Sequence, residues 1–198
     1  VSVIRNSKQE TRNQAPRILI LGIGSPFGDD RLGWEAAEAL RRSRAINEMP
    51  AGVVEISSLD RPGIMLLSCW RGTAAVILID AIRSGSLPGS LHRISHDDLA
   101  SGKTILSSHG FGIVSAIELG RVLGELPAEI VLFGVEMDPV CTPDSLSLAV
   151  TAALPRLIRQ LEKETMLLLG RIDAGCKAME PLINSGFVIP TKLGIHFT

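Results

Sequence analysis

The chain has 198 residues, 45% of them hydrophobic, and its 20 basic and 21 acidic side chains give a formal net charge of −1. This length suits one domain with a substantial core. Tyrosine is absent, and no basic stripe is interleaved with aromatic residues, so a nucleic-acid partner is not expected. The cysteines are few and widely spaced, which argues against a disulfide framework or a cysteine zinc site and favours a reducing compartment. They are Cys69, Cys141 and Cys176.

Membrane association is not expected from the sequence either. No apolar run approaches the roughly 18 residues of a membrane span. Residues 1–16, "VSVIRNSKQETRNQAP", are polar and lack the apolar core of a secretory signal. We therefore expect a cytoplasmic protein with no membrane partner, whose first 16 residues form a disordered arm.

Strand and helix patterns alternate through the rest of the chain. Apolar runs predict strands at 17–22, 52–57, 74–80 and 128–136, and a short strand follows the Pro-Gly turn within 84–94. Helices are predicted from about 29 to 44, at 61–70, from the cap-like Ser95, at 111–125, and at 143–164, where Pro155 is a candidate kink. The alternation predicts a doubly wound α/β fold: a mostly parallel sheet with helices on both faces, in three layers. We assign one domain to 17–165 and leave 166–198 as a C-terminal extension of unknown structure.

The stretch "GIGSPFGDD" at 22–30 follows the first strand and opens a helix, as a phosphate-binding loop does. It departs from G-x-G-x-x-G, because Phe27 stands where the third glycine belongs. Two acids, Asp29 and Asp30, occupy the place where the helix dipole would attract an anion. A nucleotide is therefore disfavoured. Either acid could simply cap the helix, but one cap needs only one of them.

Three side chains are expected at one edge of the sheet. Asp30 follows the first strand, Asp80 ends the run "AAVILID", and His109 precedes a helix after the next crossover. Ligands of open parallel sheets bind beyond the carboxyl ends of the strands, where these residues would converge. Two carboxylates and an imidazole suit nickel, zinc or iron, and three protein ligands leave coordination positions open. A turn-forming Asp80 and a capping or core His109 remain the plainer alternatives.

Other constellations are weaker. His92 and His96 have the spacing of a helical zinc pair, but they follow a turn into a strand and lack the Glu of H-E-x-x-H. No G-x-S-x-G elbow accompanies Ser107 and Ser108, and Cys141 lacks the context of a nucleophile. A conventional serine or cysteine hydrolase is not expected.

Four stretches of the chain are similar to a known family. They are "ILILGIGSPFGDDRLGWEAAEAL", "VILIDAIRSGSLPGSLHRISHDDL", "SSHGFGIVSAIELGRVLGELPAEIVLFGVE" and "TPDSLSLAVTAALPRLI". In this combination the chain resembles the hydrogenase maturation endopeptidases, which trim the large subunit of nickel–iron hydrogenases. The resemblance implies a doubly wound α/β hydrolase that removes a C-terminal extension from the large-subunit precursor after nickel insertion. It assigns metal recognition to Asp30, Asp80 and His109.

The resemblance also implies that the precursor supplies the nickel, which zinc or cadmium can replace in vitro. It names no catalytic set. Ser25 stands where many members have Asn, Asp30 where some have Glu, and Arg31 where a small residue is common. Asp29 and Arg31 are candidates for supporting the site or orienting a substrate carboxylate. The alternatives from other classes are a non-catalytic, metal-sensing assembly factor and a nucleotide-binding oxidoreductase.

Overall fold

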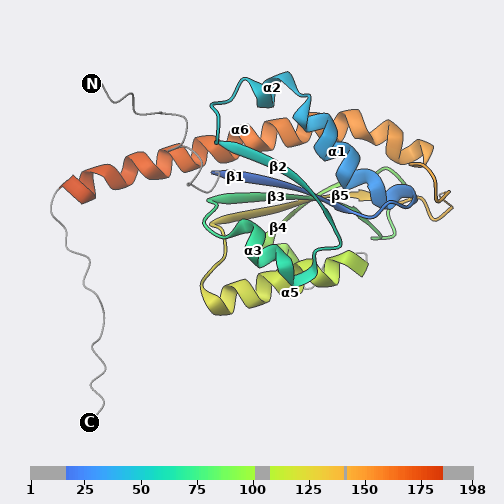
Figure 1. Cartoon of the computed structure of the whole chain (residues 1–198), viewed down its shortest axis with the longest axis horizontal. Helices are drawn as coiled ribbons and strands as arrows, with labels where there is room; N and C mark the ends of the chain where they lie inside the picture. Colours follow the sequence, from blue (N-terminus) through green and yellow to red (C-terminus); the bar gives the residue numbers. More distant parts are fainter. Residues whose placement is uncertain (1–16, 101–107, 141, 185–198) are drawn as a thin grey trace, which may run out of the picture.

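The computed structural model describes residues 17–100, 108–140 and 142–184, and for residues 100, 108–111 and 176–184 it describes the backbone alone. A five-stranded sheet forms the middle layer (Figure 1). Its strands are β1 (Ile18–Gly24), β2 (Val54–Asp60), β3 (Ala75–Ile82), β4 (Leu91–Ser95) and β5 (Glu129–Glu136). The order is β2-β1-β3-β5-β4, with β4 antiparallel to β5 and the other pairs parallel. The predicted mostly parallel sheet is confirmed. The expected N-terminal arm, residues 1–16, lies outside the described residues.

Helices cover both faces of this sheet. One face carries α1 (Leu32–Arg41) and α6 (Leu148–Asn184), with the short α2 (Arg44–Asn47) beside them (Figure 1). The other face carries α3 (Leu66–Trp70) and α5 (Ser108–Leu123), with α4 (His96–Ala100) packed against α5. The turns η2 (Gly28–Arg31) and η3 (Gly63–Met65) lead into α1 and α3. None of the helices in this described part is both long and apolar enough to cross a membrane.

Alternation along the strands divides the core into two apolar clusters. On β3, Ile77 and Ile79 belong to the cluster beneath α1 and α6, whereas Val76 and Leu78 belong to the cluster beneath α3 and α5. β3 is buried along its whole length, as the continuous apolar run predicts for a central parallel strand. By the same alternation, Asp80 belongs to the α3 and α5 side of the sheet.

Two glycines set how closely α1 approaches the sheet. A Cβ on Gly22 would lie 2.0 Å from the carbonyl oxygen of Gly33, and a Cβ on Gly33 would lie 2.1 Å from the carbonyl oxygen of Ile23. Helix and strand therefore touch backbone to backbone. This contact fixes the start of α1, and with it η2, directly above the end of β1.

One edge of the sheet is partly covered by an arginine. The carbonyl of Val53 accepts from the N–H of Ile18 on β1, so by strand alternation the main-chain groups of Ile56 face away from β1. The Ile56 carbonyl accepts from Nη2 of Arg41 at 3.2 Å, and Ser58 Oγ lies 3.3 Å from the same nitrogen. The guanidinium of Arg41 thus occupies part of the free edge of β2.

The last helix differs from its sequence-based bounds. It begins at Leu148 rather than 143 and continues through Pro155 to Asn184. Leu168, Leu169 and Ile172 pack on the same apolar cluster as Leu157 and Leu161, which is why the helix continues. Gly170 and Gly175 weaken the helical pattern in the sequence and hid this continuation. Residues 166–184, left without an assigned element, are therefore helical.

Candidate functional site

The loop between β1 and α1 brings Asp30 to the carboxyl edge of the sheet. Gly28 has a φ of 49°, a conformation that favours glycine. A Cβ on Gly24 would lie 2.1 Å from the carbonyl oxygen of Asp30, so the loop folds back closely on the end of β1. Ser25 Oγ donates to Asp30 Oδ2 at 2.8 Å and orients this carboxylate. Asp30 is half-buried and lines a cavity.

Phosphate binding is not supported by this loop. The main-chain N–H of Ser25 donates to the Asp30 carbonyl, that of Gly28 to the Pro143 carbonyl, and that of Asp30 to the Phe27 carbonyl. A phosphate cradle needs such N–H groups to point at the ligand. Here they are used within the protein, which agrees with the disfavoured nucleotide interpretation.

Asp29 turns away from Asp30 and binds a distant segment. Its fully buried carboxylate accepts from the N–H of Asp138 at 2.8 Å, from the N–H of Ser147 at 2.6 Å and from Ser147 Oγ at 3.0 Å. The start of α1 has no side-chain cap, so the expectation that Asp29 or Asp30 caps that helix is wrong. Donors more than 100 residues away satisfy Asp29 instead. Asp29 therefore ties the opening loop to the start of α6.

Asp80 lies near the end of β3 and is 1% exposed. Its register partner on β5 is Gly134, which in turn pairs with His92 on β4. The N–H of Ala81 donates to Asp80 Oδ1 at 2.9 Å. η2, which carries Asp30, contacts β3. Both predicted carboxylates thus lie at the carboxyl edge of the sheet, Asp80 on β3 and Asp30 on η2 after the neighbouring β1.

This edge is also where the strand order changes direction. β2 lies on one side of β1. The three strands that follow in the chain lie on the other side, in the order β3, β5 and β4 across the sheet. A crevice outside the carboxyl ends of the strands is the usual ligand site at such a switch point. Asp30 follows β1 and Asp80 lies on β3, the two strands between which the order changes, but the cavity that Asp30 lines does not include Asp80 in its lining.

His109 is the second residue of α5, so the helix begins earlier than predicted and includes it. Gly112 and Ile113, three and four positions further along α5, line the cavity. The side chain of His109 lies outside the described part, and whether it joins the two carboxylates stays a prediction. Among the side chains that are described, no group of three or more His, Cys, Asp or Glu could hold a metal ion.

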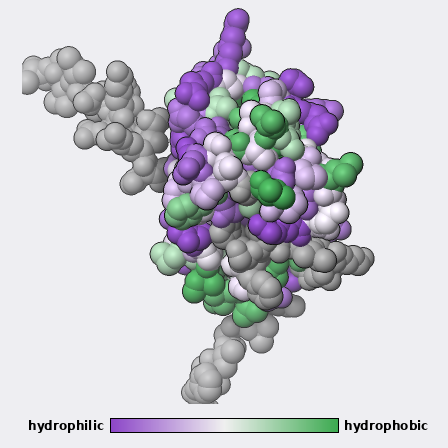
Figure 2. Space-filling model, turned by 90° about the vertical axis from the view of Figure 1, so that its right-hand side faces the viewer, coloured by the Kyte–Doolittle hydropathy of each residue, from purple (hydrophilic) through white to green (hydrophobic). Residues whose placement is uncertain are grey.

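The cavity has a volume of about 460 Å³, within the range of small-ligand sites. Both charged and apolar side chains line it, and in Figure 2, which views this end of the molecule, hydrophilic and hydrophobic residues are likewise interspersed. Its charged members are Asp30 and Arg61; the others are Ile23, Ser25, Phe27, Pro62, Gly63, Leu66, Gly112 and Ile113.

Sequence reasoning missed Arg61, which follows β2 directly. Its guanidinium contacts the neighbouring Asp60 through Nε at 2.6 Å and Nη2 at 3.2 Å. The hydrogen bond to Asp60 and the charges of Asp60 and Asp30 raise the pKa of Arg61 above its ordinary value, so it is cationic at any working pH. The available signal was its position after a strand that ends at the same edge as β1.

Glu136, at the end of β5, was missed as well. This buried carboxylate accepts from the N–H of Ser84 at 2.9 Å, from Ser84 Oγ at 2.6 Å and from the N–H of Gly85 at 2.9 Å. Burial alone would raise the pKa of Glu136, but these hydrogen bonds and the charge of His92 lower it below its ordinary value. Glu136 thereby fixes the loop that leaves β3.

The remaining sequence candidates lie elsewhere. Nη2 of Arg31 lies 3.2 Å from Glu35 Oε1, and Nη1 donates to the Asp144 carbonyl at 3.2 Å. Arg31 does not line the cavity. His92 lies on β4 and His96 begins α4, so they are not a helical zinc pair.

Comparison with known proteins gives one family. The model of a family described as "Hydrogenase maturation protease" matches residues 35–164, more than half of the chain. The matched range begins after Asp30 and includes Asp80 and His109. Hydrogenase expression/formation proteins are similar in sequence: HupD of Thiocapsa roseopersicina is 30% identical over 124 residues, 61% of this chain and 54% of that protein. HoxM of Azotobacter vinelandii is 30% identical over 125 residues, 62% of this chain and 58% of that protein. The chain thus spans little more than half the length of these curated relatives.

Solved structures share the fold. The hydrogenase maturating endopeptidase HybD from E. coli superimposes with a TM-score of 0.65 at 26% identity, covering 73% of this chain and 89% of that one. A [NiFe] hydrogenase maturation protease, HybD from Thermococcus kodakarensis, gives a TM-score of 0.60 at 24% identity, covering 75% and 99%. The second likeness shows the fold alone.

Proposed function

Because this chain belongs to the hydrogenase maturation protease family, we propose that it is an endopeptidase that removes the C-terminal segment of a nickel–iron hydrogenase large-subunit precursor. The reaction adds water across one peptide bond, which leaves a new carboxylate on the mature subunit and a free amino group on the released segment. The observation that carries the proposal is the cavity beyond the carboxyl ends of β1 and β2 in a family fold, with Asp30 in its wall.

Nickel enters this proposal as part of the substrate. Asp30 lines the cavity, and Asp80 lies near the end of β3, the strand next to β1. Carboxylate oxygens and an imidazole nitrogen are suitable ligands for a divalent first-row metal. Asp30, Asp80 and His109 would complete the coordination of a nickel ion that the precursor already carries. Docking then depends on prior nickel insertion.

The chain's own residues would position the precursor. A metal shared between substrate and protein fixes the scissile bond relative to the cavity wall, and positioning of this kind lowers a barrier without a built-in nucleophile. Ser25 holds the Asp30 carboxylate, and Asp29 holds the loop that carries it. Water attack on the positioned amide would complete the hydrolysis.

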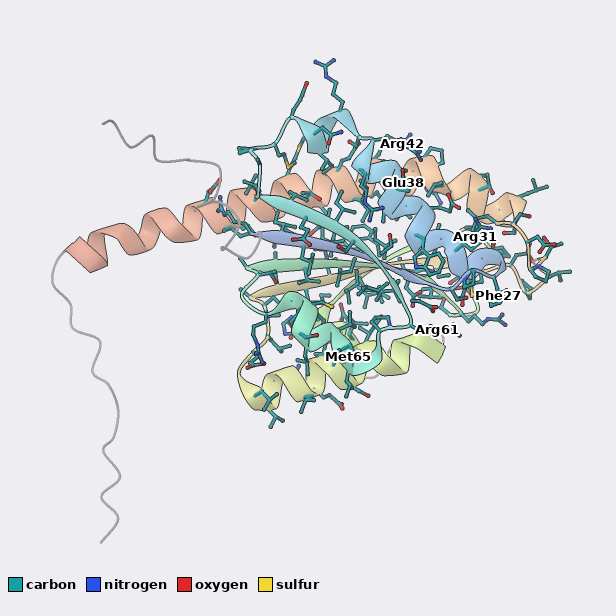
Figure 3. All side chains as sticks on the ribbon, viewed as in Figure 1. Phe27, Arg31, Glu38, Arg42, Arg61 and Met65 are labelled. Carbon is teal, nitrogen blue, oxygen red and sulfur yellow. The ribbon has the colours of Figure 1, made fainter. Side chains whose placement is uncertain are left out.

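The test mixes the purified chain with nickel-loaded and nickel-free precursor and follows the mass of the large subunit. We expect only the loaded form to be shortened. Asp30→Asn and Asp80→Asn should each lower the rate at least ~100-fold, because each removes an anionic ligand from the substrate's metal. Glu38→Gln is the matched control: Glu38 lies on α1 away from this end of the sheet and forms exposed pairs with Arg41 and Arg42 (Figure 3).

Equal shortening of both precursor forms would refute the dependence on nickel. If neither form is shortened while the loaded form still binds, the chain is instead a non-catalytic assembly factor. Full activity of Asp30→Asn would show that the cavity lined by Asp30 is not the processing site.

A further inference from the structure

Arg61 is held in a backbone conformation that side chains avoid. Its φ is 41°, and among the described residues it is the only non-glycine with positive φ. The left-handed region costs an L-residue free energy because its Cβ crowds the backbone. Such strain persists where the surrounding structure imposes it, and it gathers at ligand sites. A glycine at this position would be free of it.

The neighbouring contacts explain why the strain is not relieved. The N–H of Arg61 donates to the carbonyl of Gly24 at 3.3 Å, and Gly24 is the register partner of Asp60. On the other side, a Cβ on Gly112 would lie 2.8 Å from Gly63 Cα, so the 61–63 turn is pressed against α5. The end of β1 and the start of α5 therefore hold the backbone on either side of Arg61.

The side chain of Arg61 is oriented by its neighbour. Asp60 binds it through both carboxylate oxygens, the paired geometry that fixes a guanidinium plane. A guanidinium has further N–H donors beyond the two used here. The side chain is 55% exposed and lines the cavity that contains Asp30. It is a pre-positioned cation at the mouth of the candidate site.

Apolar residues flank this cation. Phe27 is 61% exposed and lines the cavity, and Ile64 and Met65 on η3 are 58% and 64% exposed. Figure 3 shows Phe27 and Arg61 at the same end of the molecule, with Met65 further along η3, whereas Glu38 and Arg42 lie away along α1. Exposed apolar side chains on the same side of the molecule as this guanidinium suit a peptide that carries a carboxylate among apolar groups.

We propose that Arg61 is a specificity-determining residue of this cavity, and that it binds a carboxylate in the C-terminal segment of the precursor. The proposal rests on the proposed function and names what the cavity recognises besides the metal. Asp30 and Arg61 are the two charged residues of the wall, and they have opposite signs. A substrate would be read at two points, the cationic metal at Asp30 and an anionic group at Arg61. The carboxylate is either an acidic side chain or the terminal carboxylate of the segment.

The decisive variant is Arg61→Gly. It removes the guanidinium and also relieves the positive-φ strain, so the melting temperature should stay the same or rise by about 2–4 °C. Binding of the nickel-loaded precursor should weaken roughly 10- to 100-fold, the loss expected for a charged hydrogen-bonded pair. KM should rise accordingly, with a smaller change in kcat. Arg61→Lys keeps the charge without the planar fork and should recover part of the affinity.

Arg42→Gly is the matched control. Arg42 has a φ of −93° and pairs with Glu38 at 3.3 Å on the exposed side of α1. Glycine there gains nothing from strain relief, so the melting temperature should stay the same or fall, and binding should be unchanged. Opposite responses of the two variants separate recognition from a general effect of losing a surface arginine. Wild-type affinity in Arg61→Gly would overturn the proposal.

Changes in the precursor identify the source of the carboxylate. In one set, acidic side chains of the C-terminal segment become amides one at a time; in the other, two residues are added after its last residue. A change that weakens binding to the wild-type chain, but causes no further loss of binding to Arg61→Gly, identifies the group that Arg61 binds. Additive losses in every case would refute the contact. Binding without cleavage refutes the peptidase function and leaves the Arg61 test intact; no binding by the wild-type chain overturns both.

Discussion

Two groups of charged residues, one packed against α6 and one beside the cavity, are used in opposite ways. In the first group, Asp29 and Glu164 are buried and joined to partners distant in sequence: Asp138 and Ser147 for Asp29, and Arg93 for Glu164. In the second group, Arg61 pairs with its own neighbour, is exposed, and sits in strained backbone beside a cavity. Long-range buried contacts stabilise a fold, whereas a local exposed pair contributes little stability and is available for recognition. The comparison assigns stability to the contacts of Asp29 and Glu164, and it fits the specificity proposed for Arg61.

The largest test of this division is Asp29→Ala. It would leave the N–H of Asp138 and the N–H and hydroxyl of Ser147 without their acceptor. We expect a loss of about 3 kcal/mol in the free energy of unfolding, because each buried unsatisfied donor is costly. Urea unfolding followed by circular dichroism measures it. A loss below about 1 kcal/mol would show that water replaces the carboxylate and that Asp29 does not stabilise the contact between the opening loop and the start of α6.

A smaller effect is expected from Glu164→Gln. Arg93 binds Glu164 through both oxygens, at 2.9 and 2.7 Å, and these hydrogen bonds lower the pKa of Glu164 despite its burial. The free energy of unfolding should fall by roughly 1–2 kcal/mol at neutral pH. A depressed folded-state pKa stabilises the fold above the ordinary value of 4.5, and the contribution disappears as pH falls through the lowered value.

Unfolding at several pH values checks the sign of this effect. Wild type and Glu164→Gln should differ by a constant amount above about pH 5 and converge below the ordinary pKa of 4.5. Glu162→Gln, two positions before Glu164, is a useful second variant because Glu162 accepts from Ser43 Oγ instead of Arg93. A difference that grows toward acid pH would contradict the assignment.

The smallest effect belongs to Arg31→Ala. The sequence suggested a partial loss of processing, through an oriented substrate carboxylate. Its guanidinium instead contacts Glu35 and the Asp144 carbonyl, away from the cavity lining. We expect less than about 1 kcal/mol of lost stability, as for exposed pairs, and a change in processing rate within about threefold. A tenfold loss in the precursor assay would return Arg31 to the candidate site.

Much of the fold could be predicted because the buried strands are continuous apolar runs. Residues 74–80 were predicted as a strand, and Ala75–Ile82 form one. The common edge of Asp30 and Asp80 followed from the same reasoning, since parallel strands end together. The partners of Asp29 could not be read from the sequence, because Asp138 and Ser147 approach only when β5 and α6 pack. Local capping rules predicted the wrong contact for that reason.

The conformation and the proposed role of Arg61 could not be predicted from the sequence either. A positive φ at Arg61 is imposed by the Gly24 carbonyl and by the Gly63–Gly112 contact, neither of which has a sequence signal. Arginine has no preference for that conformation, so propensity pointed elsewhere. His109 was singled out by type and position, and its place in the first turn of α5 is known, while its role as a ligand stays a prediction.

Arg41, at the outer edge of β2, affects the tendency of the protein to aggregate at high concentration. An open strand edge offers unpaired N–H and C=O groups to any other extended chain, which is the usual start of edge-to-edge aggregation. Here Arg41 occupies the Ile56 carbonyl with a bulky, hydrated cation, and Glu38 holds that cation at 3.2 Å. A strand approaching along this edge would have to displace the guanidinium and strip its water. At this part of the β2 edge, charge and solvation therefore oppose the addition of another strand.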